Sequence, residues 1–546
     1  LGCPKNRVDT EKLLGSLGMP ITEAEDIRQA RLVFVNTCGF ITPAVKESID
    51  SILEIIRDLE DVKHRPLLAV GGCMVGRYGA EELARELPEV DLWLPTADML
   101  RWPDRIREKL GIKEGEVPGR VLSGPTSYAW LKVSEGCRHH CSFCTIPSIR
   151  GPLKSRPMDE IVAEAGDLLA SGVKELVLIA QDLTDYAQDT NPGGENLAAL
   201  LGRLAGLDGL FWLRILYLYP KGITPELLKT IRDIGKPILP YFDIPLQHSH
   251  PEILKSMGRP FAADPERTCD AIREVLPDAA LRTTLIVGYP GETDAQFQHL
   301  CDFVERMRFT QLGVFTFWPE EGSAAAALDG QLPQEIKDER RDEIMSIQRD
   351  ISASFMEQQV GKKMDVLVDS VNPEWPGLHD GRVWFQAPEI DGLTYVSGPG
   401  VEPGVHVSAE IVDNGDYDLT ALTEAGANVE DFKKPVEAKE SAAPDYFPTM
   451  GSVEVPEQWD ESYDVVVVGG GFAGLAAAYS AEKAGSSVVL VEKLSTTGGN
   501  SAINGGQYAA YTSERAAELQ QKLGLEPDTA EKHIEDTIKG GDNMSN

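Results

Sequence analysis

Cysteine is scarce in this chain, and its scarcity excludes one class of protein. Only 8 of the 546 residues are cysteine, which is too few for disulfides to stabilise a chain of this length. Six of the eight fall into two groups of three, and such clustering is typical of metal sites in a reducing compartment. We therefore expect a cytoplasmic protein whose metal centres are built from thiols.

Basic residues and long apolar runs are also in short supply. The 52 Lys and Arg residues are outnumbered by 87 Asp and Glu residues, which leaves a formal net charge of −35. Such a surface repels the phosphates of nucleic acids and attracts basic partners. No apolar run reaches the ~18 residues that a helix needs to cross a bilayer, so we expect no membrane partner.

The sequence does contain a compact cysteine motif. Cys137, Cys141 and Cys144 follow one another at the spacing C-x3-C-x2-C. Thiolates suit iron–sulfur clusters, and a four-iron cube normally takes four of them, so three thiolates leave one iron open to a small molecule. The alternative is zinc, although zinc sites usually finish with another Cys or His at regular spacing, and His139 and His140 lie inside the loop itself.

This motif resembles the signature of radical S-adenosylmethionine enzymes. The resemblance implies that S-adenosylmethionine chelates the open iron through its amino and carboxylate groups. It also implies that one electron from the reduced cluster cleaves the cofactor to a 5′-deoxyadenosyl radical. Cys137, Cys141 and Cys144 are then metal ligands, and no further catalytic side chain is assigned.

A second group of three cysteines precedes this motif. Cys38 and Cys73 each follow a short apolar run and precede a helical pattern, and Cys3 also stands just before a helical pattern. Strand–cysteine–helix units in series predict a doubly wound α/β domain over residues 1–115, with ligands gathered at the carboxyl ends of its strands. A first strand is expected before Leu1. The alternative is three ordinary buried thiols.

Together the two groups resemble the methylthiotransferase family. The resemblance rests on Gly-Cys-Pro-Lys-Asn at 2–6, Asn-Thr-Cys-Gly at 36–39 and Gly-Gly-Cys at 71–73, followed by the radical motif. It implies two [4Fe–4S] clusters, the second held by Cys3, Cys38 and Cys73 and used to hold or deliver the inserted sulfur. We therefore expect an external electron donor and a sulfur donor as partners.

Residues 116–355 alternate six short apolar runs with helical patterns, which predicts an open (β/α)6 partial barrel. The cysteine motif follows the first of these strands, at the face where such sheets carry their active sites. Further polar residues at strand ends are either pocket residues or simple turn and cap residues: Gln181, Asp182, Gln247, His248 and 288–292. Cys269 and Cys301 lie within helical patterns and are expected to be structural thiols.

Residues 356–424 contain short strands separated by Gly, Pro, Asn and Asp, which predicts a small five-stranded β-barrel. Its place matches the TRAM domain of the family. Over 361–424 three Lys or Arg residues stand against twelve Asp or Glu residues, a balance that disfavours tRNA and favours a basic ribosomal protein. The stretches 2–6, 146–151, 216–220 and 244–248 also resemble the branch of the family that modifies a ribosomal protein.

We therefore expect a transferase that uses 5′-deoxyadenosyl radical chemistry on an aspartate of a small-subunit ribosomal protein. It would insert sulfur and a methyl group at the β-carbon of that aspartate. A tRNA adenosine methylthiotransferase is the alternative within the same class. Two alternatives come from other classes: an iron–sulfur flavoprotein for electron transfer, and a ribosome-associated binding module whose clusters are purely structural.

The end of the chain carries an unrelated motif. Residues 425–460 are predicted to be a linker, and residues 461–546 begin with a strand, a G-x-G-x-x-G turn, a helix and a second strand. Gly469, Gly471 and Gly474 would let the backbone approach a pyrophosphate, and Glu492 would bind the ribose hydroxyl. This segment of about 85 residues resembles the start of the FAD-binding domain of fumarate-reductase-type flavoproteins.

We predict that residues 457–546 bind FAD weakly or not at all by themselves, because strands that would complete the sheet are missing from the segment. The visible absorption spectrum of the purified segment tests this prediction. Flavin absorbance that co-purified with the segment would contradict it.

Overall fold

The computed structural model describes residues 1–18, 27–60, 62–112, 119–194, 196–259, 264–375, 377–423, 465–468 and 488–491. The chain divides into two compact units, Leu1–Pro435 and Val436–Asn546. Among the described helices, none combines the length and the apolar composition that crossing a bilayer requires.

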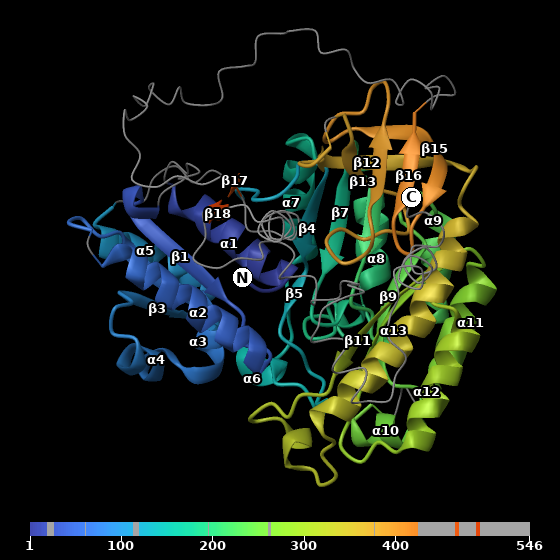
Figure 1. Cartoon of the computed structure of the whole chain (residues 1–546), viewed down its shortest axis with the longest axis horizontal. Coiled ribbons are helices and arrows are strands. Elements are labelled where there is room, and N and C mark those ends of the chain that lie inside the picture. Colours follow the sequence, from blue (N-terminus) through green and yellow to red (C-terminus); the bar gives the residue numbers. More distant parts are fainter. Residues whose placement is uncertain are drawn as a thin grey trace. The chain divides into compact units, whose positions relative to one another are not determined.

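The N-terminal elements form a parallel three-stranded sheet with helices on both faces, as predicted (Figure 1). Its strands are β1 (Leu32–Thr37), β2 (Leu67–Gly72) and β3 (Leu92–Pro95). The helices α2 (Thr42–Leu59), α3 (Cys73–Tyr78) and α4 (Ala80–Glu86) pack on one face, and α1 (Pro4–Leu17) and α5 (Trp102–Leu110) on the other. Strand β3 has no counterpart among the predicted strands, because its apolar run is only three residues long.

The centre of the first unit contains the six predicted strands in two parallel blocks. These are β4 (Tyr128–Lys132), β7 (Glu175–Ile179) and β8 (Trp212–Ile215), followed by β9 (Tyr241–Gln247), β10 (Ala280–Val287) and β11 (Gln311–Thr316). A parallel bridge between Leu213 and Ile238 joins the two blocks. The strands run through a large apolar core, in which Cys269 and Cys301 are buried as expected.

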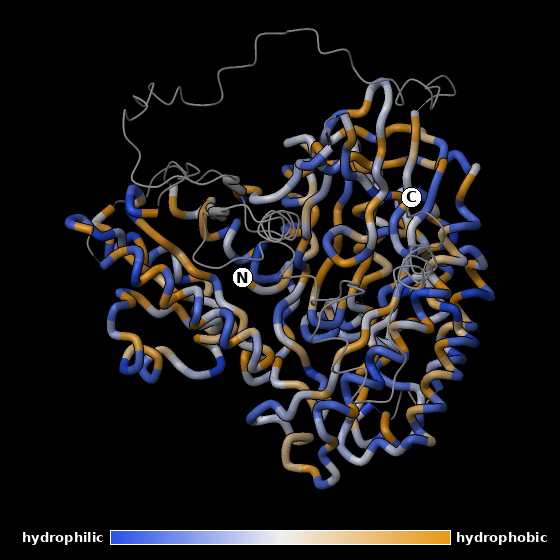
Figure 2. Tube along the Cα trace, in the orientation of Figure 1, coloured by the Kyte–Doolittle hydropathy of each residue, from blue (hydrophilic) through white to orange (hydrophobic). Residues whose placement is uncertain are grey.

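Helices follow the central strands and cover them. They are α7 (Met158–Ala170), α8 (Leu197–Ala205), α9 (Pro225–Ile234), α10 (Pro251–Ser256), α11 (Pro265–Val275), α12 (Asp294–Met307) and α13 (Gln334–Glu357). Figure 2 shows hydrophobic and hydrophilic residues interleaved along α12 and α13. Such helices bury one apolar stripe and expose the rest; in α12 the buried stripe includes Phe297, Leu300 and Val304.

A closed five-stranded barrel follows the central strands, also as predicted. Its strands are β12 (Lys363–Val371), β13 (His379–Arg382), β14 (Thr394–Ser397), β15 (His406–Asn414) and β16 (Leu419–Leu422). The barrel shares an apolar cluster with the first residues of four central strands: Tyr128, Trp212, Tyr241 and Ala280. It therefore covers the amino ends of those strands, away from the carboxyl ends that the cysteine motif follows.

A buried ion network fastens this barrel to the central strands. The Glu175 carboxylate accepts from Arg214 Nε and from Arg382 NH1, each at 2.6 Å, and all three side chains are at most 1% exposed. The carboxylate of Asp369, in the barrel, accepts a hydrogen bond from Arg382 Nε at 2.6 Å. Pairing of this kind is what allows charges to be buried at all.

The described part of the second unit consists of β17 (Val465–Val468) and β18 (Val488–Val491), which pair in parallel. These are the two strands predicted around the G-x-G-x-x-G turn. The predicted nucleotide-binding residues Gly469, Gly471, Gly474 and Glu492 lie outside the described residues.

Candidate functional site

The loop after β4 and β5 (Ser134–Glu135) carries the first cysteine triad, Cys137, Cys141 and Cys144, and leads into α6 (Ile146–Arg150). Gly136 enters this loop with φ +74°, and a Cβ atom there would lie 2.2 Å from a backbone oxygen, so only glycine fits. Burial raises the pKa of the Cys137 thiol to about 11 and that of Cys144 to about 12. These thiols must lose protons when they bind a metal.

The second triad, Cys3, Cys38 and Cys73, gathers around the side chain of Asn6. The thiols of Cys3 and Cys73 both donate to Asn6 Oδ1, at 3.8 and 3.6 Å. Asn6 Nδ2 donates to the carbonyl oxygen of Thr37, the residue before Cys38, at 2.9 Å. Three chain segments therefore bring their cysteines to one place at the carboxyl edge of the N-terminal sheet.

The spacing of the thiols argues against a single zinc ion. Tetrahedral zinc with Zn–S bonds of about 2.3 Å brings its sulfur ligands to within about 4 Å of one another. Among the described residues, the group of three or more possible ligands lying within 4.8 Å of one another is His139, Asp182 and Asp185, and it contains no cysteine. Neither cysteine triad forms such a group among the described residues, and His139 faces Asp182 at 2.7 Å.

Arg150, at the end of α6, connects the two triads. Its Nε lies 3.2 Å from Cys73 Sγ, and its NH2 donates to Asn6 Oδ1 at 2.5 Å. Its NH1 donates to Asp9 Oδ2 at 2.8 Å and to Glu135 Oε2 at 2.9 Å. The segment that follows the first triad thus reaches directly into the second, through a side chain that is 2% exposed.

Lys132 completes this buried network. Its Nζ pairs with Asp9 and donates to Glu135 Oε2 at 2.7 Å. Gln181 Nε2 donates to the other oxygen of Glu135 at 2.6 Å. Burial would raise the pKa of the Glu135 carboxyl, but the charges of Lys132 and Arg150 lower it to about 2. The positive charges of Lys132 and Arg150 therefore balance the negative charges of the two carboxylates, Asp9 and Glu135.

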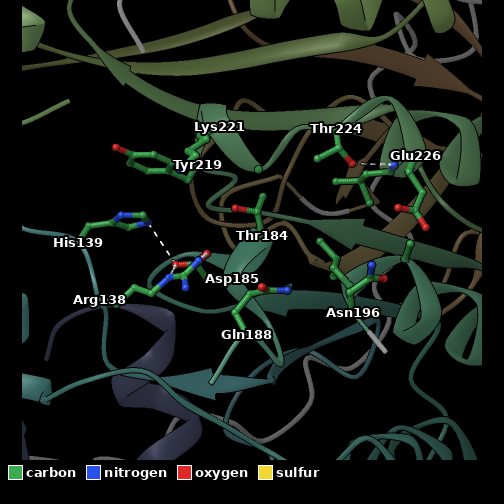
Figure 3. Close-up of a pocket in the computed structure, with 14 residues that line it drawn as sticks. Arg138, His139, Thr184, Asp185, Gln188, Asn196, Tyr219, Lys221, Thr224 and Glu226 are labelled. Carbon is green, nitrogen blue, oxygen red and sulfur yellow. Dashed lines mark hydrogen bonds and ion pairs between the residues drawn. The ribbon is translucent and has the colours of Figure 1, made fainter. Parts of the chain in front are cut away.

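A pocket of about 460 Å³ opens beside the first triad (Figure 3). His139 lies on one wall, with its ring stacked on Tyr219 at 4.0 Å between ring centres. Arg138 holds Asp185 through two hydrogen bonds of 2.6 and 2.7 Å. The pocket combines charged side chains of both signs with an aromatic wall, which suits a polar ligand rather than a lipid.

Several buried polar atoms around the first triad and at the ends of the central strands have no partner among the described residues, and they include Gln181 Oε1, Gln247 Oε1 and Arg259 Nε. Gln181 follows β7, and Gln247 is the last residue of β9. Arg259 contacts the first triad, because its NH1 lies 3.8 Å from Cys141 Sγ. An unsatisfied buried group costs about 1–3 kcal/mol. These atoms therefore fit the polar groups of a bound cofactor.

Comparison with known proteins assigns most of the chain. The Radical SAM superfamily matches residues 131–304, and the TRAM domain matches residues 360–423. The Uncharacterized protein family UPF0004 matches residues 1–95, and the FAD binding domain matches residues 464–546.

Whole-length relatives decide the family. The "Ribosomal protein uS12 methylthiotransferase RimO" of Nitratidesulfovibrio vulgaris (strain DP4) is 57% identical over 423 residues, which cover 77% of this chain and 98% of the relative. The proteins of the same name from Oleidesulfovibrio alaskensis and Lawsonia intracellularis are 56% and 48% identical, over 98% and 97% of their lengths and 78% of this chain. The chain belongs to the RimO family.

Membership of the RimO family, with its radical SAM domain, confirms a radical S-adenosylmethionine enzyme that uses S-adenosylmethionine and [4Fe–4S] chemistry. Among solved structures, the radical S-adenosylmethionine methyltransferase TsrM from Kitasatospora setae is similar, at 14% identity and a TM-score of 0.42. The match covers 64% of this chain and 66% of that one.

The structure divides the polar strand-end residues that the sequence left open. In this RimO family member Gln181 and Asp182 lie beside the first triad, because Gln181 contacts Glu135 and Asp182 contacts His139. His248 instead pairs with Glu292 at 3.1 Å, with both side chains fully buried. Glu292 also binds Arg340 at 3.1 Å, so His248 and Glu292 belong to a buried ion network.

Proposed function

We propose that this chain transfers a methylthio group to the β-carbon of an aspartate in the small-subunit ribosomal protein uS12. The observation that carries the proposal is the 57% identity, over 98% of its length, to a uS12 methylthiotransferase. The presence of two cysteine triads supports it, because the reaction needs both a radical and a source of sulfur, and Arg150, from the segment after the first triad, contacts Cys73 of the second. An aspartate β-carbon has no proton acidic enough for a side-chain base to remove readily, so a radical suits the task.

The two triads divide the work in this proposal. Cys137, Cys141 and Cys144 hold one [4Fe–4S] cluster, and Cys3, Cys38 and Cys73 hold a second. When bound, these clusters and S-adenosylmethionine would supply the radical chemistry, a site for sulfur delivery and the methyl group.

The protein side chains position these groups and exclude water. Arg150 and Asn6 fix the thiol of Cys73, and the buried charges of Asp9 and Glu135 fix Arg150. Gln181 and Gln247 offer unpaired polar atoms at the carboxyl ends of the strands, and Arg259 offers one beside Cys141. Preorganised partners of this kind hold a cofactor without having to rearrange during the reaction.

Residues 1–115, 116–355 and 356–424 act in this proposal as the cluster-binding, radical and TRAM domains. An external electron donor and a sulfur donor serve them in a reducing cytoplasm. Residues 425–460 link them to the FAD-like segment 461–546. The proposed reaction is assigned to the first compact unit, which contains both triads.

We expect the cluster-reconstituted full chain, reduced and given S-adenosylmethionine, to methylthiolate uS12 and to leave tRNA unmodified. The acidic barrel and the protein-branch stretches are the reasons for this preference. Mass spectrometry of both substrates after the same incubation makes the measurement. Modification of tRNA adenosine, with uS12 unchanged, would contradict the proposal.

A further inference from the structure

Two of the stretches that resemble the ribosomal-protein branch meet in the structure. Lys5 belongs to the stretch 2–6, and Tyr217 belongs to the stretch 216–220. The ammonium of Lys5 lies 3.4 Å from the centre of the Tyr217 ring, which is a close cation–π contact. More than two hundred residues of sequence separate them.

This contact lies between the two cysteine triads. Lys5 is in the first turn of α1, two residues after Cys3. Tyr217 follows the carboxyl end of β8, two residues before Tyr219, whose ring stacks on His139 in the loop of the first triad. A ligand that touched Lys5 would therefore have one triad on each side.

Tyr217 is held in a constrained backbone conformation. Its φ is +61°, a value that residues with bulky side chains rarely adopt. The carboxylate of Asp243 accepts from the Tyr217 N–H at 3.0 Å, and the carbonyl oxygen of Tyr217 accepts from the Leu183 N–H at 3.0 Å. Non-glycine residues in this region cluster at functional sites, and here the constraint aims the ring at Lys5.

Lys5 differs in its charge balance from the two cations of the buried network. Arg150 and Lys132 are neutralised by Asp9 and Glu135. No carboxylate of the described residues pairs with Lys5. The half-buried ammonium therefore keeps its positive charge available for an incoming anion.

We propose that Lys5 binds the carboxylate of the target aspartate and thereby selects aspartate in the substrate protein, with Tyr217 as the residue that positions it. The inference rests on the proposed function and deepens it. A buried carboxylate without a cation is strongly disfavoured, so an aspartate-specific site needs one. The carboxyl carbon is bonded directly to the β-carbon, so a carboxylate held at Lys5 keeps the reacting carbon beside Cys3 and its triad.

The test compares two substrates and four enzymes, all as cluster-reconstituted full chains. The substrates are unmodified uS12 and uS12 with its target aspartate replaced by asparagine, which keeps the shape and removes the charge. The enzymes are the wild type, Lys5→Met, Lys5→Arg and the control Lys46→Met, which removes an exposed lysine of α2. Dissociation constants are measured at one salt concentration, and 5′-deoxyadenosine formation without substrate reports on the radical site.

We expect the wild type and Lys46→Met to bind the aspartate substrate about 10- to 100-fold more tightly than the asparagine substrate. Lys5→Met should bind both substrates equally, because the carboxylate contact that distinguishes them is lost. Lys5→Arg should keep the preference, since it keeps the charge.

A Lys5→Met enzyme that still bound the aspartate substrate more tightly than the asparagine substrate would overturn the inference. This includes the case in which its affinity for both substrates fell by the same factor. Loss of the clusters in both Lys5 variants would also overturn it, because Lys5 would then be structural. A wild type that methylthiolated uS12 without preferring aspartate would overturn the role of Lys5 alone. A wild type that neither bound nor modified uS12 would overturn the proposed function together with this inference.

Discussion

Replacing Cys141 with alanine is expected to abolish 5′-deoxyadenosine formation, whereas replacing Cys38 with alanine should leave it intact and stop sulfur insertion. The reason is that, in the proposed function, each triad holds its own cluster, so loss of one thiolate would remove a direct iron ligand. Loss of a mere outer contact typically costs about 10- to 100-fold, so we expect the loss of a ligand to cost more. Liquid chromatography of 5′-deoxyadenosine and mass spectrometry of uS12 measure the two activities separately.

Cys301 provides the matched control for these two variants. It is a buried thiol in α12, far in the sequence from both triads. Cys301→Ala removes one sulfur atom from the core and should leave both activities near the wild-type level. Equal loss of both activities in Cys38→Ala and Cys141→Ala would refute the division of labour between the triads.

Replacing Arg150 with methionine should destabilise the protein by about 3–5 kcal/mol, because it leaves one negative charge of the buried network uncompensated. Asp9 and Glu135 would then share Lys132 as their single cation in this network. The cluster at the second triad should also lose the N–H donor that now lies 3.2 Å from Cys73 Sγ. Fewer hydrogen bonds and less positive charge at the sulfur lower a cluster's reduction potential.

Denaturant unfolding of the iron-free proteins and an EPR-monitored redox titration of the loaded ones measure these two effects. Adding Glu135→Gln to Arg150→Met removes the excess charge, so the two changes together should cost less than their sum. Arg203→Met removes the exposed ion pair with Asp159 and should cost less than about 1 kcal/mol. A loss for Arg150→Met no larger than that of Arg203→Met would contradict the account of the network.

The stability that Glu135 contributes depends on pH in a defined direction. The folded-state pKa of its carboxyl is lowered to about 2 from an ordinary value of 4.5. Its stabilising effect is therefore fully present above pH 4.5 and is lost as the pH falls toward 2. Comparisons of the Arg150 variants belong above that window.

The strands and the two cysteine triads could be predicted because their signals are local. Runs such as Leu176–Ile179 are apolar throughout, as parallel strands buried on both faces are. Each cysteine of the N-terminal triad stands at a strand end or a helix start, and the carboxyl ends of parallel strands meet at one edge. The five-stranded barrel was likewise predictable from short strands between turn residues.

The network between the triads could not be predicted, because its members are far apart in sequence. Asp9 and Arg150 lie 141 positions apart, and nothing in either stretch indicates the other. One local signal was available: Lys132 is a charged residue at the end of an otherwise apolar strand, and such a residue needs a buried partner. The contact between Lys5 and Tyr217 was hidden in the same way, although both stretches had been recognised.

The polar residues at strand ends show a second limit of sequence reasoning. Gln181 and His248 both follow buried strands, yet Gln181 contacts Glu135 near the first triad, and His248 pairs with Glu292 in the core. The difference arises from which neighbours the tertiary fold supplies. Local pattern cannot separate these two outcomes.

Iron and sulfide analysis with Mössbauer spectroscopy, performed anaerobically on the reconstituted chain, measures how many clusters the two triads hold. Our prediction is two [4Fe–4S] clusters, about eight iron atoms per chain, and about four after alanine replaces all three cysteines of either triad. A chain with a single cluster, whose iron content did not change when Cys3, Cys38 and Cys73 were replaced, would contradict it.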